Sequence, residues 1–476
     1  MCTQFNTYLK LENELENKWI VYYLGLAWAA ELGNGVIQTI TGPMQPYLAF
    51  NLSTDTWTIN LVWTLGFIGF LVGSILTSYT FTKHLVTGRL KLMTMFLTLL
   101  LTGLSTLSLP FSPNLPILLF CRFVQFLCYG IFLTGDSILL VFTLGPETSR
   151  PFINILHFFI SIGFLIGTFL VQPFLPETSE EVCRSNSKLL DNSSFGNLSK
   201  LDSGLQGGQE NQENSSLHIE TILGIQSICW PFLISAGWCI CISFGFVLLS
   251  YSNLQMPKFY GSNSSKSRTD FSSKSSDKLS RTGKRIFLVL VVLFFSLSGA
   301  VVRVFQSMTT TFALCGPLAL DSHSAALTDS FFSSGMCLGR MFSVLLSTIF
   351  LPSTLLCSST LFCGVASLLL LLLAPHFTEG LYSGVLIMGF FVSWQFGTGF
   401  SWTSQYMNIT GKLSSLFFVG LGVGSIISPP LAGYIFTINS MWVLYLAAVL
   451  VLIQVVTVAL LHLVSKKGSS AQKEER

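Results

Sequence analysis

Charged residues are scarce in this sequence. Of 476 residues, 25 are Lys or Arg and 22 are Asp or Glu, which together make 10% of the chain, while 51% are apolar. The mean hydropathy is +0.65. This composition excludes a soluble globular domain and is typical of a protein that crosses a membrane several times.

The sequence also lacks the residue clusters that catalysis or nucleotide binding requires. It contains only 6 His, and its charged groups are scattered over many segments. No Walker motif is present. Most of the 11 Cys lie in apolar runs, where a thiol acts as a small apolar group. We therefore expect no enzyme activity, no bound cofactor or metal, and no nucleic-acid partner.

Long apolar runs are what the sequence has in abundance. A helix needs roughly 20 apolar residues to cross a bilayer core of about 30 Å, and these runs are too long for the strands of a membrane barrel. The sequence predicts an all-α membrane protein with twelve transmembrane helices. The expected spans are 19–50, 56–80, 91–111, 114–142, 150–175, 222–251, 286–314, 324–348, 353–374, 380–406, 413–436 and 440–464.

The spans form two groups of six, joined by a polar segment rich in Lys and Arg. Because positive loops stay in the cytoplasm, this linker, 252–285, is expected there. An even number of spans then places both the N-terminus, 1–18, and the tail, 465–476, on the same side. The first 18 residues do not have the features of a cleavable signal peptide. The two predicted halves are 19–251 and 286–464.

The loop at 176–221 is expected on the outside. Its clustered Asn-x-Ser sequons indicate glycosylation, although chance sequons in a Ser-rich loop are the other reading. The candidate sites are Asn192, Asn197 and Asn214. Cys183 in this loop and Cys315 after the seventh span both lie outside and could pair; two free thiols are the reading that we favour.

Gly and Pro recur at matching positions in the two halves. The matching sets are Gly42-Pro43 with Gly316-Pro317, Gly69 and Gly73 with Gly335 and Gly339, and Gly163, Gly167 and Pro173 with Gly420, Gly424 and Pro430. Gly and Pro repeated in the same order in both halves indicate that the halves arose by duplication. Two parallel six-helix pseudo-repeats are the plan of the major facilitator superfamily, in which the substrate site lies between the halves.

Individual motifs add to this resemblance. The stretch "RFVQFLCYG" in the fourth span resembles the superfamily's R-x-x-Q-G pattern through Arg122, Gln125 and Gly130. The loop after the second span is a poor match to the superfamily signature, because Ser78 stands where an acidic residue is usual.

A closer resemblance covers most of the chain. Segments 151–176, 330–356 and 399–424, with the pairs Gly339-Arg340 and Ser401-Trp402, are similar to the sodium-dependent glucose transporter 1 group and the related major facilitator domain-containing protein 4 orphans. The resemblance implies a sugar carrier coupled to sodium.

Three departures from that group bear on the coupling. Where the group carries acidic residues in its fourth, seventh and eleventh spans, this chain has Leu133, Val301 and Ser425. Asp136 lies one helical turn beyond Leu133 and could take its place. A sodium site needs hard oxygen ligands and usually a carboxylate, so the departures argue against sodium coupling.

Few ionisable residues lie inside the spans, and each is a functional candidate because a charge at depth is costly. Glu31 lies about 18 Å into the first span, near the midplane. Two roles are open: a structural ion pair with Arg122 of the fourth span, which we favour slightly, or a carboxylate that binds a proton or cation together with the substrate.

The other buried charges are candidates for coupling or gating. Asp136 near the inner end of the fourth span could be solvated or paired with a loop cation. Arg340 could belong to the gate that closes the inner face, and Arg303 could meet Asp329. Both arginines could instead extend to an interface.

An uncharged sugar needs amides and hydroxyls for its hydroxyl groups and an aromatic face for its ring. The candidate substrate ligands are Asn34, Gln38, Gln45, Gln306, Trp394 and Gln395. The alternative for the amides is hydrogen bonding between helices, and for the tryptophans a place in the interfacial belt.

The sequence thus predicts a carrier of a small polar solute, glucose or a related hexose, in a lipid bilayer. The expected partners are the hexose and a co-transported Na+ or H+, and glycosylation with sugar transport favours the plasma membrane. Two alternatives stay open: a proton-coupled carrier of another organic solute, and a facilitator fold that serves as a sensor or scaffold without transport.

Overall fold

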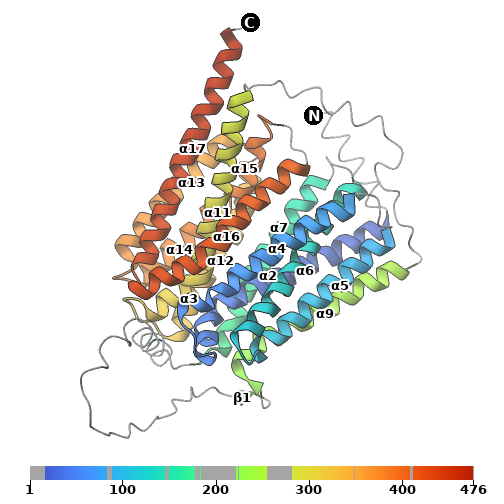
Figure 1. The fold of residues 1–476 in the computed structure, drawn as a ribbon, viewed down its shortest axis with the longest axis vertical. Helices are drawn as coiled ribbons and strands as arrows, with labels where there is room; N and C mark the ends of the chain where they lie inside the picture. Colours follow the sequence, from blue (N-terminus) through green and yellow to red (C-terminus); the bar gives the residue numbers. More distant parts are fainter. Residues whose placement is uncertain are drawn as a thin grey trace, which may run out of the picture.

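The computed structural model describes residues 17–82, 88–144, 149–176, 183, 221–222, 225–252, 254, 281–347, 349–407 and 411–474. Almost all of these residues are helical (Figure 1). In these ranges the strands are β1 (Thr221–Ile222) and β2 (Ile225–Gln226), which form a short antiparallel pair. The predicted all-α class is confirmed.

Six helical spans make up the N-terminal half. They are α2 (Lys18–Asn51), α3 (Thr56–Ile59) with α4 (Leu61–Thr82), α5 (Gly88–Ser108), α6 (Leu115–Leu144), α7 (Ser149–Val171) and α9 (Trp230–Tyr251). Short 3-10 turns follow α5, at Leu109–Phe111, and α7, where η2 is Gln172–Phe174. Within this half α2 packs on α7, α4 on α6, and α5 on α9.

The C-terminal half repeats this arrangement. It contains α11 (Arg281–Cys315), α12 (Ser322–Leu346), α13 (Pro352–Leu373), α14 (Thr378–Val392) with α15 (Gln395–Thr403), α16 (Gly411–Ile438) and α17 (Trp442–Glu474). Here α11 packs on α16, α12 on α14, and α13 on α17, which are the same pairs shifted by six spans. The packing therefore shows the two pseudo-repeats that the glycines and prolines predicted.

Close backbone approach explains two of the repeated glycines. A Cβ on Gly73 of α4 would collide with the backbone oxygen of Leu127 on α6. In the other half, a Cβ on Gly339 of α12 would collide with the backbone oxygen of Phe390 on α14. Glycine at these equivalent positions lets the paired helices touch along their backbones.

Three predicted spans differ from the structure. The helix of the twelfth, α17, continues past its predicted end at 464 to Glu474. The sixth begins at Trp230 instead of 222, because β1, β2 and a 3-10 turn occupy 221–229. The tenth is interrupted after Val392: the N–H of Trp394 bonds the oxygen of Phe391 in a tightened turn, and the hydroxyl of Ser393 bonds Phe390 O at 2.9 Å. The helix therefore divides into α14 and α15 at a tightened turn.

Large apolar side chains cover the outside of the helices. Leu248 is 73% exposed, and Val289 and Leu372 are each 67% exposed. Eleven helices in the described ranges are long and apolar enough to cross a membrane. The helix α12 has 25 residues but carries many hydroxyl groups, Asp329 and Arg340. The chain is a multi-pass membrane protein.

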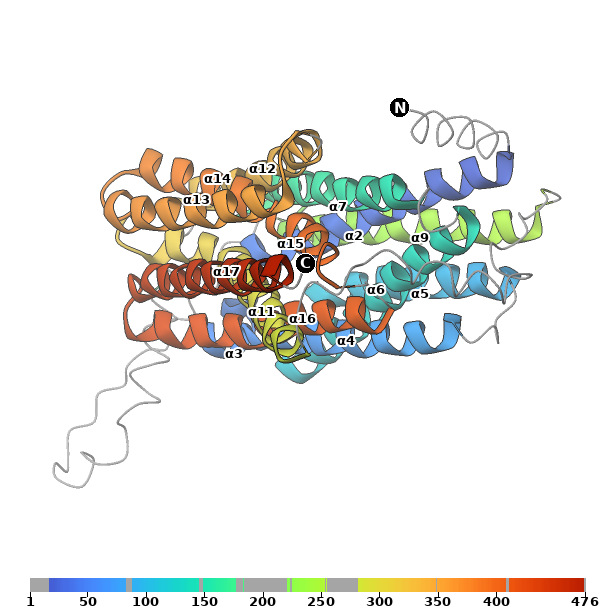
Figure 2. The ribbon, with the colours of Figure 1, turned by 90° about the horizontal axis from the view of Figure 1, so that it is seen from above.

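The two halves lie side by side, as both views show (Figures 1 and 2). We call the end of the molecule with the β1–β2 pair the outer end, and the opposite end, where α17 finishes, the inner end. The halves contact each other chiefly through α7 with α12, α3 and α4 with α16, and α2 with α11. The hydroxyl of Thr64 on α4 donates to Ile426 O on α16 at 2.8 Å.

A disulfide joins Cys183 to Cys315, with Cα atoms 5.5 Å apart. We favoured two free thiols from the sequence, and that reading is wrong. Cys315 is the last residue of α11, so the bond connects the segment after α7 to the outer end of the C-terminal half.

Candidate functional site

Buried amides of α2 lie among the helices of the N-terminal half. Asn34, Gln38 and Gln45 are 2%, 4% and 1% exposed. The Oε1 of Gln45 accepts a bond from Trp63 Nε1 on α4 at 2.8 Å. The side-chain nitrogens of Asn34 and Gln45 have no hydrogen-bond partner among the described residues. Asn34 and Gln45 lie about 16 Å apart along α2, and neither lines the polar cavity between the halves.

Gln306 on α11 is a buried candidate amide of the C-terminal half. Its Oε1 accepts a bond from the Arg303 guanidinium on the same helix, and its Nε2 has no partner in the described ranges. The guanidinium of Arg303 lies over the ring of Phe67 on α4, 4.2 Å from its centroid. Arg303 thus reaches across to the N-terminal half, and the predicted pair with Asp329 does not form.

A small polar cavity lies between the halves. Its lining residues are Thr39 of α2, Thr168 of α7, Gln306 of α11, and Asp329 and Ser333 of α12. The room inside it is about 10 Å³, which is about the space of one water molecule or ion and far too small for a hexose. We call this arrangement, in which α2 and α7 pack against α11 and α12, the contracted state.

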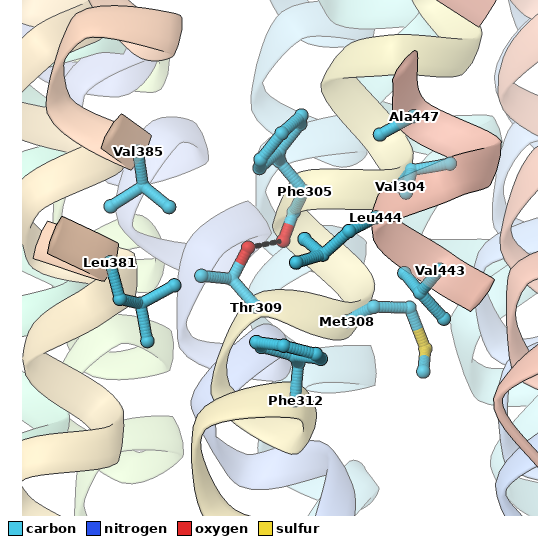
Figure 3. A pocket seen from close by; sticks show the side chains of 10 residues that line it. All are labelled: Val304, Phe305, Met308, Thr309, Phe312, Leu381, Val385, Val443, Leu444 and Ala447. Carbon is cyan, nitrogen blue, oxygen red and sulfur yellow. Dashed lines mark hydrogen bonds between the residues drawn. The ribbon is translucent and has the colours of Figure 1, made fainter. Parts of the chain in front are cut away.

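A second cavity, with room of about 20 Å³, lies within the C-terminal half (Figure 3). Its lining is apolar apart from Thr309, whose hydroxyl bonds the oxygen of Phe305 one turn earlier. It offers a polar solute no free hydrogen-bonding group, so we place the candidate site at the smaller polar cavity.

The predicted ion pair between Glu31 and Arg122 is wrong. Arg122 Nη1 donates instead to Gln125 Oε1 on its own helix at 2.5 Å, and its guanidinium lies 4.4 Å from the centroid of Phe126. Neither oxygen of Glu31 has a hydrogen-bond partner among the described residues, although its side chain is fully buried. The guanidinium of Arg122 also lies 5.2 Å from the ring centroid of Trp63, so Arg122 packs against α4.

Asp136 is the charged neighbour of Glu31. Asp136 is 1% exposed and accepts a hydrogen bond from the hydroxyl of Tyr23 on α2. It lies within electrostatic range of Glu31. The expectation that Asp136 is solvated or paired with a loop cation is therefore wrong, because α2 covers it. Two acidic groups and one phenol share the inner part of the N-terminal half.

Arg340 connects the two halves nearer to the inner end. Its Nη1 donates to the backbone oxygen of His157 at 2.5 Å and to Ser161 Oγ at 2.6 Å, both on α7. The ring of His157 in turn lies against Phe396 of α15, with centroids 6.1 Å apart. This places Arg340 at a contact that separates if α7 and α12 move apart; its role as a gate stays a prediction.

Gln395 lies inside the C-terminal half, away from the polar cavity. It accepts bonds from Ser298 of α11 at 3.0 Å and from Gln454 of α17 at 2.7 Å. This is the hydrogen bonding between helices that was the alternative to substrate binding. Trp394 packs against Phe390 and Phe391 at 5.4 and 5.3 Å between centroids, so it too stays within its own half.

Two residues beside the site were not predicted as ligands. Tyr129 of α6 lies beside Gln38 and within electrostatic range of Arg303 and Arg340. It is part of the "RFVQFLCYG" stretch, but a single Tyr in an apolar run gives no signal of its own. Asp329 was considered only as a partner of Arg303, and its place in the polar cavity requires the packing of four helices.

The three candidate glycosylation sites, Asn192, Asn197 and Asn214, lie outside the described residues.

Comparison with solved structures defines the class of protein. A bacterial homologue of the human lysosomal transporter Spinster, in an inward-facing and unoccupied conformation, has a TM-score of 0.63 at 12% identity and covers 96% of this chain and 98% of its own. The transporter FucP in its outward conformation has a TM-score of 0.58 at 17% identity, covering 92% and 99%. The chain has the major facilitator fold.

Sequence relatives support the resemblance to one group of carriers. Sodium-dependent glucose transporter 1 of Xenopus laevis is 26% identical over 83% of this chain and 72% of its own length, and the Homo sapiens protein of that name is 22% identical over 85% and 72%. Major facilitator superfamily domain-containing protein 4A of Xenopus tropicalis is 22% identical, over 73% of each chain. No family model matches. The predicted resemblance to both groups is confirmed.

Proposed function

We propose that this chain carries a hexose, or a similar small neutral polyol, across a membrane by alternating access. The relatives named as glucose transporters support this substrate class, as does the structural likeness to the fucose:proton symporter FucP, with a TM-score of 0.55. We place the protein in the plasma membrane with both termini in the cytoplasm and the 176–221 loop glycosylated.

The observation that carries the proposal is an unsatisfied amide donor in the polar cavity between the halves. The side-chain nitrogen of Gln306 is buried without a partner in the described part of the chain. An unmet buried donor costs about 1–3 kcal/mol. A hydroxyl of a polyol would accept this bond, and the lining of the cavity comes from both halves, so a polyol bound there would contact both.

The proposed transport cycle follows from the contacts between the halves. In the contracted state the polar cavity is closed by α2 and α7 on one side and α11 and α12 on the other. Rocking of the halves would expose the cavity first to one side and then to the other. We propose that an ion gradient of Na+ or H+, or the gradient of the solute itself, drives net flux.

Uptake of radiolabelled glucose by proteoliposomes tests the proposal. Gln306→Leu should raise the half-saturation concentration by roughly ten-fold, since one good hydrogen bond to a solute is worth about 1.4 kcal/mol. The matched control Gln454→Leu makes the same change away from the cavity and should leave the half-saturation concentration unchanged. Absence of uptake and counterflow in folded wild-type protein would refute the proposal, and binding without counterflow would favour the sensor or scaffold.

One observation favours a second candidate, a carrier of an organic anion. Arg303 and Arg340 contact no carboxylate in the described ranges; their donors go to Gln306, His157 and Ser161. Two such cations beside Tyr129 could hold an anionic group.

Glucuronate has the ring of glucose with an added carboxylate, so competition between glucuronate and glucose distinguishes the two candidate substrates. Glucuronate should compete poorly with glucose if the substrate is neutral, and better than glucose if it is an anion. A dependence of uptake on pH would support proton coupling.

A further inference from the structure

We propose that Asp329 is the centre of a binding site for Na+ in the polar cavity between the halves. This inference rests on the proposed carrier function and identifies its coupling ion and the residues that hold it.

The carboxylate of Asp329 is buried and only half satisfied. Its side chain is 4% exposed. The Oδ2 accepts a hydrogen bond from the hydroxyl of Thr310 at 3.0 Å, and Oδ1 has no partner among the described residues. A buried carboxylate needs a partner because removing its hydration is costly. Asp329 lines the polar cavity, in which a ligand can supply that partner.

No basic side chain in the described lining of the cavity supplies it. The cavity walls from α2, α7 and α11 present Thr39, Thr168 and Gln306, all of them uncharged. The nearest cation along α11 is Arg303, which lies about 10 Å before Thr310 at 1.5 Å per residue and whose guanidinium is bonded to Gln306. The negative charge in the cavity is therefore not compensated by the groups that face it.

The chemistry of the lining favours a small hard cation. Besides the carboxylate, the cavity offers the hydroxyl oxygens of Thr39, Thr168 and Ser333. Carboxylate and hydroxyl oxygens are hard ligands that suit alkali and alkaline-earth ions, and the described lining contains no thiolate or imidazole. With one carboxylate rather than several, the site carries a single negative charge, which matches a monovalent ion.

The position of the site explains how the ion would be coupled to transport. Asp329 lies about 10 Å below the outer start of α12, and near it Gln172 of η2 bonds Ser330 Oγ across the halves at 2.9 Å. The oxygens come from both halves, so they surround an ion only when the outer ends have closed. Bound Na+ would therefore shift the population toward the state closed on the outside.

Gly42 makes this convergence possible. A Cβ at this position of α2 would lie 2.8 Å from Asp329 Oδ2 and 2.5 Å from the backbone oxygen of Gln306. Only a residue without a side chain lets α2 approach the carboxylate so closely. The Gly-Pro pair that the sequence repeats thus lies directly beside the proposed ion.

Thermal unfolding of the purified full chain, without sugar, tests the site. NaCl should raise the melting temperature in a saturable way relative to equal choline chloride, because an ion that binds only the folded state stabilises it. Asp329→Asn, which keeps the size of the side chain, should abolish this rise. Thr39→Val should raise the Na+ concentration for half effect by about ten-fold. The control Glu379→Gln removes an exposed charge from the same half and should leave the rise intact.

Three results would overturn the site: equal stabilisation by choline, a Na+ response that survives in Asp329→Asn, or a response that low pH reproduces without Na+, which would indicate a proton. If Asp329→Asn does not fold, the variants Thr39→Val and Ser333→Ala test the site instead. An unchanged Na+ concentration for half effect in both variants would refute it. Na+ stabilisation without any hexose uptake would refute the sugar proposal alone. Hexose uptake that neither Na+ nor Asp329→Asn alters would refute the site alone.

Discussion

Replacing Arg340 by Gln should loosen the contact between α7 and α12. In the structure one nitrogen of Arg340 donates to His157 O at 2.5 Å and to Ser161 Oγ at 2.6 Å, both in the other half. Hydrogen bonds from a charged donor contribute about 1.5–3 kcal/mol each. Gln retains one weaker donor, so we expect a net loss of at least about 1.4 kcal/mol, which shifts the conformational equilibrium about ten-fold toward states with these helices apart.

Spin labels near the inner end measure this shift. Tyr22 on α2 is 60% exposed, and Ile349, between α12 and α13, is 74% exposed, so both accept a label without disturbing the core. Arg340→Gln should lengthen or broaden the distance distribution between them. Arg340→Lys keeps the charge and should give an intermediate result, and Ser161→Ala removes one of the two acceptors and should act in the same direction.

An unchanged distribution in folded Arg340→Gln protein would refute the reasoning, because it would mean that the two hydrogen bonds contribute nothing to holding the halves together. An equal change in Arg340→Lys would show that side-chain packing, and not bonding to α7, controls the distance.

Three further predictions concern single side chains. Tyr23→Phe should destabilise the fold by about 1–3 kcal/mol, because it leaves the buried carboxylate of Asp136 without its donor; a lower melting temperature checks this. Asp321 caps α12, where hydrogen bonds from the hydroxyl and N–H of Ser324 lower the pKa of Asp321. Asp321→Ala should therefore cost about 0.5–2 kcal/mol at neutral pH. Because the pKa of Asp321 is lower in the folded state, its ionised form stabilises the fold at pH values above its unfolded pKa of about 3.9. The difference in melting temperature between the wild type and Asp321→Ala should therefore vanish as the pH falls and Asp321 of the wild type protonates. Gln395→Leu should lower the melting temperature yet leave the half-saturation concentration for glucose unchanged; a large rise in that concentration would return Gln395 to the substrate site.

The fold could be predicted from the sequence because its determinants are local. A run such as 353–374 is apolar enough to require a membrane, and the structure places α13 at Pro352–Leu373. The duplicated glycines are also recognisable from the local sequence, since Gly73 and Gly339 lie at equivalent backbone contacts in the two halves. The sixth and tenth spans were less accurate because a short strand pair and a tightened turn change little in the apolar pattern.

The partners of the buried charges could not be predicted, since they depend on how helices far apart in the sequence pack together. Glu31 and Arg122 lie in the same half, but the guanidinium of Arg122 bonds Gln125 of its own helix and lies over Trp63 of α4. Asp136 is one turn from Leu133, yet its partner is Tyr23, 113 residues away. Amide side chains have the same ambiguity: Gln306 lines the polar cavity, whereas Gln395 bonds within its half. Only the packing distinguishes a ligand from a link between helices.

The bond between Cys183 and Cys315 closes a covalent ring that contains α9, the polar linker and α11. The halves are consequently joined twice, by the peptide chain after α9 and by the two sulfur atoms at the other end of α11. Cutting the linker would open the ring without releasing either half, so a nicked chain would migrate as one species until a reductant separates it into two. A motion that tilts the halves must also keep both connections intact, which sets an upper bound on how far the outer ends can part.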